Sequence, residues 1–233
     1  MMHLPNRTES RELEITRKFG LAQVVYRPVE LGGLHESLSK DKAFYGLDEG
    51  LRTVCDALKL PCSTLGTCWR QRETLGPEEP VVKLIVWAQR RFAEEGNYAP
   101  ACGTINLFGT LSSLFHEVAH AIDFQHGKNG VPWSHGELWI GALNGAPEFC
   151  GHLLANLQNK SRVRLSDLYL GAPHEIFARA FECLVLERSV AMWAFKPDCS
   201  CPKSYPQGIE RTVLCEIIEN KLIKSLRASA RSQ

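Results

Sequence analysis

The residues best suited to chemistry stand together as His116-Glu117-Val118-Ala119-His120. Two histidines four positions apart on a helix project from one face, one turn from each other. That spacing lets two imidazole nitrogens reach a single zinc ion at about 2.0–2.1 Å. Glu117 is rotated away from this axis, so it would reach a metal-activated water and take its proton. The pattern predicts a zinc site with Glu117 as a general base.

Apolar or small residues surround this motif, among them Phe115, Val118 and Ile122. They recur at steps of three and four, so the helix is expected to be packed inside the protein. The alternative is that the ionisable residues fell together by chance on a surface helix. The apolar neighbours argue against that alternative. On a packed helix, burying three ionisable side chains without a shared partner costs free energy.

A catalytic zinc site needs a third protein ligand, and His126 is the first candidate. It lies ten residues after His116, the spacing of the HExxHxxGxxH pattern. That pattern has a glycine for a sharp turn where this sequence has Asp123, which tolerates such a turn less well. If the helix instead continues through Phe124, His126 points away from the metal.

Glu175 is the second candidate, on a predicted helix at 173–188 that Pro173 opens. Glu175, Arg179 and Glu182 follow the i, i+4, i+7 spacing and form a polar stripe on an otherwise apolar helix. Such a stripe is either a solvated face or a functional one. The spacing alone leaves both readings, and both third ligands, open.

Asp123 lies on the same helical face as His116 and His120. A carboxylate there could accept a ring N–H from a metal-binding histidine and hold its orientation. The alternative is a partly exposed aspartate at a helix end.

The text HEVAHAID followed by EIFARAFE resembles the zinc peptidases of the lethal-factor type, in which an HExxHxxD helix precedes an ExFAxAF helix. It is even more similar to metallopeptidase-like domains of large polyvalent proteins of phages and integrative elements. Those domains share the ARAFE wording and a later YPQG before a final helix. The resemblance covers roughly residues 100 to 226 and implies a gluzincin-like, zincin-like fold. It implies these roles: Glu175 as third zinc ligand, Glu117 as base, Asp123 beside the ligands, and Arg179 and Glu182 bracing the ligand helix.

The same resemblance singles out Tyr169. In the lethal-factor type a tyrosine shortly before the ligand glutamate assists the oxyanion, and Tyr169 stands six residues before Glu175. A phenol there could donate to charge that develops on the substrate. The alternative is a loop tyrosine packed on the core.

The elements around these residues predict an α+β fold, mostly helical with a small sheet. A short edge strand is expected at 97–109, directly before the HExxH helix, and its residues 103–107 are expected to pair with an extended substrate. The other predicted elements are one or two strands at 13–29, a helix or a strand followed by a helix at 81–96, and helices at 47–60, 110–127, 147–159, 173–188 and 209–226. Residues 1–96 form an N-terminal part with short strands and helices, either separate or packed on the same core, and 97–233 form the predicted metallopeptidase domain.

The composition and net charge of the chain limit the classes of partner that it is expected to bind. Hydrophobic residues make up 44% of the chain, enough for a real core, and a net charge of +1 gives no field for nucleic acid or a membrane surface. No signal peptide or membrane span is recognisable, so a cytoplasmic location is expected, with delivery into a target cell as an alternative. Nine cysteines are then expected as free thiols, and Cys199-Ser-Cys201 lacks the second pair of a structural zinc site.

These observations predict a zinc peptidase with a protein or peptide substrate, and by analogy one directed at a host or competitor. The first rival function is a catalytically silent metallopeptidase fold that serves as a binding module in a phage or mobile-element assembly. The retained Glu117 argues against it, since metal binding needs no base. The second rival is an interaction protein whose His and Glu stripe is a solvated helix face. Oligomeric state and cleavage preference are not encoded in these patterns.

Overall fold

The computed structural model describes residues 29–32, 40–65, 83–87, 96–101, 103–108, 113–128, 130–145, 169–189 and 205–231. Helices make up most of these residues and a small sheet accompanies them, so the predicted α+β class is confirmed. The predicted strands at 13–28, the predicted helix at 147–159 and the Cys199–Cys201 pair lie outside the described residues.

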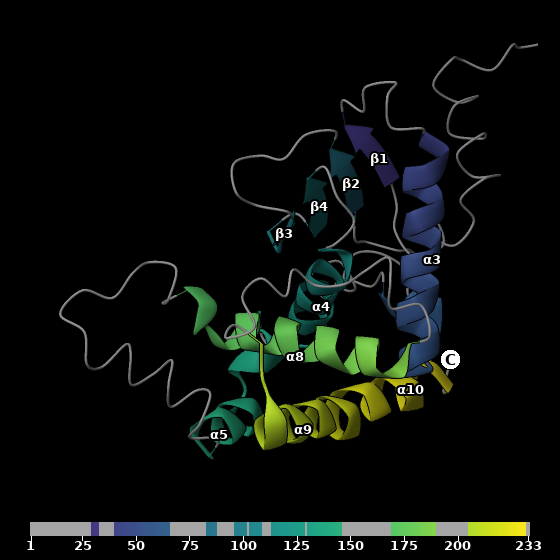
Figure 1. Ribbon diagram of the computed structural model, residues 1–233. Helices are drawn as coiled ribbons and strands as arrows, with labels where there is room; N and C mark the ends of the chain where they lie inside the picture. Colours follow the sequence, from purple (N-terminus) through teal and green to yellow (C-terminus); the bar gives the residue numbers. More distant parts are fainter. Residues whose placement is uncertain are drawn as a thin grey trace, which may run out of the picture.

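A four-stranded mixed sheet forms one layer, in the order β1-β2-β4-β3 (Figure 1). Its strands are β1 (Val29–Gly32), β2 (Lys83–Trp87), β4 (Thr104–Phe108) and β3 (Gly96–Ala99). β1 pairs with β2 and β2 with β4 in parallel, whereas β3 and β4 form an antiparallel pair. Of the two predictions for 81–96, the one that begins with a strand agrees with β2, and the helix predicted after it lies outside the described residues.

The segment 97–109 differs from its prediction as one edge strand. It belongs to two strands, and β4, which carries the predicted edge residues, lies inside the sheet between β2 and β3. Four of the five β4 residues are buried, as expected of a strand that has neighbours on both sides. The turn before β4 uses Gly103 at φ 60°, a conformation that favours glycine. The outer strand of the described sheet on this side is therefore β3.

Two helices at the centre of the fold carry the residues of interest. α4 (Leu114–Gln125) lies beside the sheet, and α8 (Pro173–Arg188) crosses next to it (Figure 1). α8 begins at Pro173 and ends at Arg188, as predicted, because proline fits a first-turn position. α4 ends before Gly127, where a side chain would collide with the Val131 carbonyl at 1.9 Å.

One hydrophobic core joins the N-terminal and C-terminal parts. α3 (Lys40–Leu58) contributes the predicted apolar face, and its four residues are fully buried: Leu47, Leu51, Val54 and Leu58. They belong to the same buried cluster as Phe115 of α4 and Phe177 and Phe181 of α8. α5 (Glu137–Gly145) adds the fully buried Trp139, whose Nε1–H donates to the Pro173 carbonyl at 3.2 Å.

The predicted C-terminal helix is longer than expected. α9 (Gly208–Ile217) continues through a π-helical segment (Ile218–Ile223) into α10 (Lys224–Arg231). These helices run along α8 on the side away from the sheet (Figure 1). Across the described ranges, no helix is both long and apolar enough to span a membrane.

Candidate metal centre

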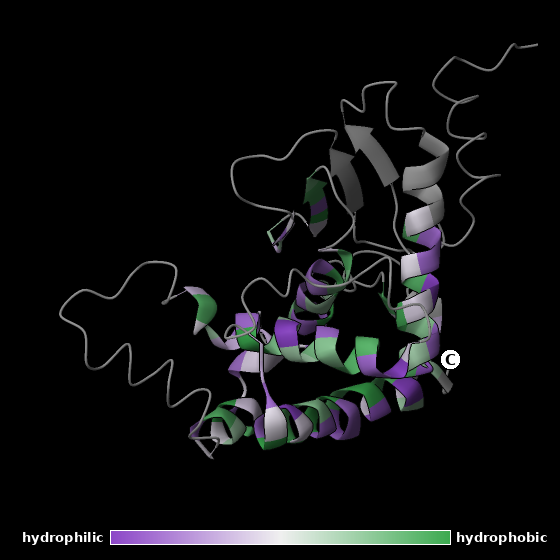
Figure 2. Cartoon of the chain, viewed as in Figure 1, coloured by the Kyte–Doolittle hydropathy of each residue, from purple (hydrophilic) through white to green (hydrophobic). Residues whose placement is uncertain are grey.

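The helices α4 and α8 bring three donor groups to one point. His116 and His120 lie one turn apart on α4, and their Nε2 atoms are 3.1 Å from each other. Glu175, in the first turn of α8, places Oε2 3.3 Å from His116 Nε2 and Oε1 3.3 Å from His120 Nε2. The three residues could therefore hold one metal ion. Figure 2 shows hydrophilic residues interrupting the hydrophobic ones along both helices.

The geometry of this triangle fits a tetrahedral metal ion. Ligands at about 2.0–2.1 Å from a tetrahedral zinc are about 3.3–3.4 Å from one another. The observed distances of 3.1–3.3 Å, which join the two histidine Nε2 atoms to each other and to different oxygens of Glu175, are close to that value. Imidazole nitrogen and carboxylate oxygen are donors that zinc accepts.

The charge around the histidines also fits a cation. Four ionisable residues here are at most 3% exposed: Glu117, Glu175, Glu182 and Arg179. Three buried carboxyl groups thus accompany one buried guanidinium, so acidic groups outnumber basic ones beside the two histidines. Buried charges are costly unless they are balanced, and a divalent ion would balance these.

His126, the rival third ligand, is not part of this group. α4 continues through Gln125, and His126 forms its C-cap, with its backbone N–H donating to the Ile122 carbonyl at 3.0 Å. The helix therefore makes no sharp turn at Asp123 that would bring His126 back. Within the described ranges, the group able to hold a metal contains Glu175.

Arg179 contacts the back of the Glu175 carboxylate. Its Nη1 lies 3.2 Å from Glu175 Oε2, and its Nη2 donates to the Leu170 carbonyl. Burial by itself would raise the pKa of Glu175, but its hydrogen bonds and charge interactions with His116 and His120 hold that pKa far below its usual value. Glu175 is thus a carboxylate, the form that binds a metal.

Glu182 holds the outer nitrogen of His116. The distance from His116 Nδ1 to Glu182 Oε1 is 2.5 Å. Burial lowers the pKa of His116, but the charge of Glu182 and the hydrogen bonds to Glu175 and Glu182 outweigh it and raise the pKa to about 10. For His120 burial dominates, and it lowers the pKa to about 4. The two histidines of the site therefore differ strongly in their affinity for a proton.

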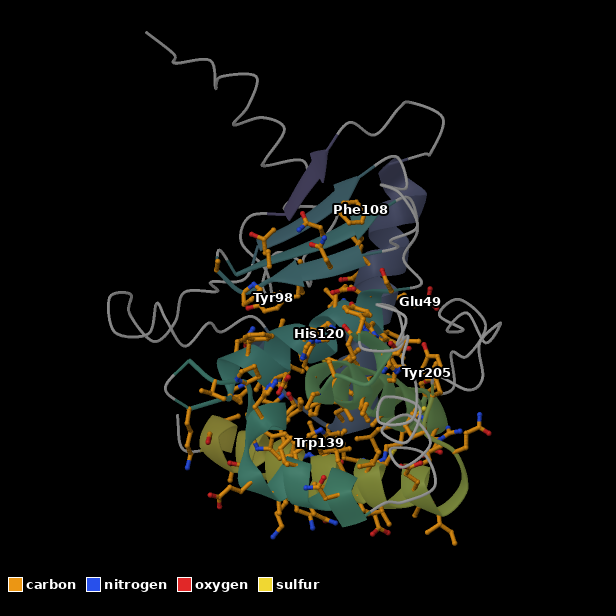
Figure 3. All side chains as sticks on the ribbon, turned by 90° about the vertical axis from the view of Figure 1, so that its left-hand side faces the viewer. Glu49, Tyr98, Phe108, His120, Trp139 and Tyr205 are labelled. Atoms are coloured by element: carbon orange, nitrogen blue, oxygen red, sulfur yellow. The ribbon has the colours of Figure 1, made fainter. Side chains whose placement is uncertain are left out.

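Tyr205 is a member of this network that the sequence reasoning did not identify. Its hydroxyl donates to Glu182 Oε2 at 2.7 Å, from the segment just before α9. Burial and the neighbouring Glu182 raise the pKa of Tyr205, so the phenol stays a donor. In the sequence, Tyr205 is marked only by the YPQG motif of the resemblance, because no helical periodicity links it to α8. Figure 3 shows Tyr205 and His120 on the same side of the molecule, below the sheet.

Glu117 lies on the side of α4 that faces β3. It is 3% exposed, and its charge acts on both His116 and Tyr169. A Cβ at Gly96 of β3 would lie 3.0 Å from Glu117 Cγ, so the strand backbone passes directly against this side chain. The Tyr98 and Phe124 rings, 5.7 Å apart, add a second contact between β3 and α4.

Tyr169 lies beside the cluster, with part of its side chain exposed to solvent. It is 58% exposed and stands just before α8. Partial burial and the charge of Glu175, with which the phenol hydrogen bonds, raise the pKa of Tyr169. The structure thus brings Tyr169 to the same group as Glu175 and keeps its hydroxyl protonated.

Asp123 is the candidate that the structure places elsewhere. It is fully buried, and its two oxygens accept hydrogen bonds from the Ser134 N–H and Oγ–H, each at 2.7 Å. The predicted bond to a histidine ring is therefore wrong: His116 Nδ1 is held by Glu182, and His120 Nδ1 has no partner among the described residues. The short aspartate side chain is satisfied by the loop after α4, which it fastens to the helix.

Two further histidines, His174 and His135, extend a row of ring contacts from His120. The His174 ring lies 5.7 Å from the His120 ring and 5.7 Å from the His135 ring. Burial lowers the pKa of His174, which favours a neutral ring.

Comparison with protein-family models, curated proteins and solved structures gives no match. The chemistry of the site is therefore argued from its geometry.

Proposed function

We propose that this protein is a zinc-dependent peptidase whose metal is held by His116, His120 and Glu175. The observation that carries the proposal is the group of three donor side chains on two packed helices, whose facing nitrogen and oxygen atoms are 3.1–3.3 Å apart. Glu117 supports hydrolysis in particular, because a site that only binds metal does not need a buried carboxylate next to its first ligand. A zincin-like fold is part of the same proposal.

A zinc ion at this site would supply Lewis-acid chemistry, polarising a carbonyl group and making a water molecule more acidic. Glu117 then accepts a proton, as its position one residue after His116 permits. Tyr169 is a neutral, partly exposed phenol next to Glu175, and it donates a hydrogen bond to charge developing on the substrate oxygen. Arg179 and Glu182 hold Glu175 and His116 in place from behind.

The substrate in this proposal is an extended peptide that pairs with the outer strand β3. β3 is the last strand in the described sheet, and its Gly96 is packed against Glu117. A peptide that paired with this strand would place its carbonyl groups close to Glu117, the proposed base. The predicted pairing with 103–107 is thus replaced by pairing with 96–99, because β4 is already paired on both sides.

Zinc stoichiometry by mass spectrometry on the purified full chain tests the metal site. We expect one zinc per chain, loss of zinc in Glu175→Ala, and retention in the matched variant His126→Ala. Loss in His126→Ala alone would move the third ligand. Absence of zinc from the wild-type chain after metal supplementation would remove the proposal.

A peptide-library assay with Glu117→Gln tests the reaction. We expect cleavage by the zinc-loaded wild-type chain and a loss of about 100-fold or more in the variant, since general bases contribute on the order of 10²–10⁴. Zinc content should stay unchanged in the variant. If the wild-type chain binds zinc but shows no cleavage that depends on Glu117, the silent binding module becomes the better description.

A further inference from the structure

Tyr205 reaches the candidate metal centre from a part of the chain separate from both ligand helices. Its hydroxyl donates to Glu182 Oε2 at 2.7 Å, and the other oxygen, Glu182 Oε1, lies 2.5 Å from His116 Nδ1. We propose that Tyr205 is a positioning residue that raises the metal affinity by fixing Glu182 and, through it, His116. This inference rests on the metal site of the proposed function, and it does not require peptidase activity.

The argument begins with the His116 ring. An imidazole that binds a metal is neutral and carries one N–H, so when that proton is on Nδ1 and donates to Glu182, the lone pair is on Nε2. Nε2 is the atom that faces His120 and Glu175. Glu182 therefore selects the tautomer that can bind a metal at the centre, a role that outer carboxylates commonly have for histidine ligands.

Tyr205 matters because a carboxylate that is held at one oxygen can still rotate. The Glu182 side chain is 5% exposed, so water contributes little to holding its second oxygen. Tyr205 supplies the second hydrogen bond and fixes the carboxylate plane. Removal of the hydroxyl would leave one oxygen of a buried charge without this donor, and Glu182 would turn to satisfy it.

The same contact links the C-terminal segment to the metal centre. Tyr205 lies shortly before Gly208, where α9 begins. Two contacts join α9 to α8: the Arg211–Glu187 ion pair at 2.8 Å, and the Cys215 Sγ–H, which donates to the Ala180 carbonyl at 3.5 Å. Correct docking of α9 therefore delivers the hydroxyl to Glu182. The affinity of the metal site depends on a residue about 30 positions beyond its last ligand.

The test measures the zinc dissociation constant of the full chain by competition with a chelating dye. Phenylalanine keeps the ring, so Tyr205→Phe removes only the hydroxyl. We expect it to weaken zinc binding by about 3- to 10-fold, less than the roughly 10- to 100-fold expected for Glu182→Gln, because Tyr205 acts at one remove. Thr212→Val is the matched control: it removes a hydroxyl that bonds the Gly208 carbonyl within α9, and it should bind zinc like the wild type.

The double variant separates positioning from a general structural effect. If Tyr205 acts through Glu182, adding Tyr205→Phe to Glu182→Gln should weaken zinc binding no further. Equal affinities of Tyr205→Phe and wild type, or strictly additive losses in the double variant, would overturn the role of Tyr205 while leaving the metal site standing. A wild-type chain that binds no zinc would overturn the metal site and this role together. A zinc-loaded chain that cleaves no peptide would remove only the proposed reaction.

Discussion

Two clusters of charged residues join α8 to its neighbours, and they differ in which of their contacts are tight. The inner cluster is the metal centre with its supports: His116, His120, Glu175, Arg179 and Glu182. The outer cluster lies at the end of α8 and consists of Arg188, Glu219 and Arg227. In each, one carboxylate has both oxygens in contact with nitrogen atoms.

The outer carboxylate makes the shorter contacts. Glu219 lies 2.6 Å from Arg188 and 2.8 Å from Arg227, with 14% of its side chain exposed. Glu175 is only 2% exposed, yet its contacts with Arg179 and the histidines measure 3.2–3.3 Å. Burial makes charges expensive, so a buried ion pair should need the closer geometry. The observed order is the reverse.

The tight contacts of the inner cluster lie on its outer side. The distance from His116 to Glu182 is 2.5 Å and that from Tyr205 to Glu182 is 2.7 Å, whereas the inward contacts among the two histidine Nε2 atoms and the two Glu175 oxygens measure 3.1–3.3 Å. The outer hydrogen bonds of these side chains are short, and their inward-facing atoms are farther apart. This arrangement leaves a shared centre between the two histidines and Glu175. The comparison supports the proposal that the inner cluster holds an ion, whereas the contacts of the outer cluster are made among its own members.

The largest difference between the clusters should follow from removing one arginine from each. Arg179→Met leaves Glu175 buried without its guanidinium and should lower the free energy of unfolding by about 3–5 kcal/mol. Arg188, whose side chain is 39% exposed, contributes as a surface pair does, so Arg188→Met should cost below about 1 kcal/mol. Urea unfolding of the metal-free chain, with chelator present, measures both. Equal losses would show that burial does not distinguish the clusters.

The space around the inner cluster gives the next largest effect. Alanine at Gly96 would place a Cβ 2.6 Å from Ser113 Oγ and 3.0 Å from Glu117 Cγ, so Gly96→Ala should destabilise the protein by about 1–3 kcal/mol. Gly141 in α5 has no heavy atom within 4 Å of its added Cβ, and Gly141→Ala should stabilise by up to about 1 kcal/mol. Thermal melting of both variants measures this contrast. A neutral Gly96→Ala would mean that β3 can withdraw from Glu117, and the proposed substrate strand would lose its fixed position.

The sequence predicts the helical half of the site well, because local rules decide it. The HExxH spacing places both histidines on one face of α4, Pro173 begins α8, and the i, i+4, i+7 stripe places Glu175, Arg179 and Glu182 on one side. These relations depend only on helical periodicity. The choice of Glu175 over His126 needed the resemblance, and the structure now shows the helix end that spacing could not supply.

The contacts that the sequence could not predict join segments without a common period. Asp123 bonds Ser134 in a loop, and Tyr205 meets Glu182 from another segment; both pairings depend on how the chain returns. The edge strand was misplaced for a similar reason. Alternation in 97–109 indicates extended chain, but strand order depends on β2, which is distant in sequence.

Asp123 offers a smaller test, because it is a buried carboxylate on α4 whose hydrogen-bond donors come from Ser134 instead of a cation. Burial raises its pKa from 3.8 to about 7, against the two bonds from Ser134. The folded state therefore binds more protons than the unfolded state between these values, and stability falls as pH rises through that window. Asp123→Asn removes this contribution, so the unfolding free energy of wild type minus variant should fall with a slope of up to about 1.4 kcal/mol per pH unit.

Urea unfolding of the metal-free chain at several pH values between 4 and 8 measures that difference. Thr212→Val changes no ionisable group, so its difference from the wild type should be flat with pH, which makes it the matched control. A difference that is flat with pH would mean that Asp123 is ionised in the fold at all these values. Its burial would then have to be balanced by more than Ser134.

The smallest effect belongs to the outer carboxylate. Glu219 lies in the π-helical segment between α9 and α10, where it meets Arg188 and Arg227, and Arg227 also donates to the Leu58 carbonyl at the end of α3. Glu219→Gln keeps the size and one acceptor and removes the charge, so the loss should be below about 1 kcal/mol. Because partly exposed charges are screened by salt, this loss should shrink in about 1 M NaCl, where the Debye length is near 3 Å. The loss in Arg179→Met should persist there, because solvent ions do not reach a buried pair. Melting curves of both variants at low and high salt measure the contrast, and a salt-sensitive Arg179→Met would show that the inner cluster is open to solvent ions, against the enclosed metal site proposed for it.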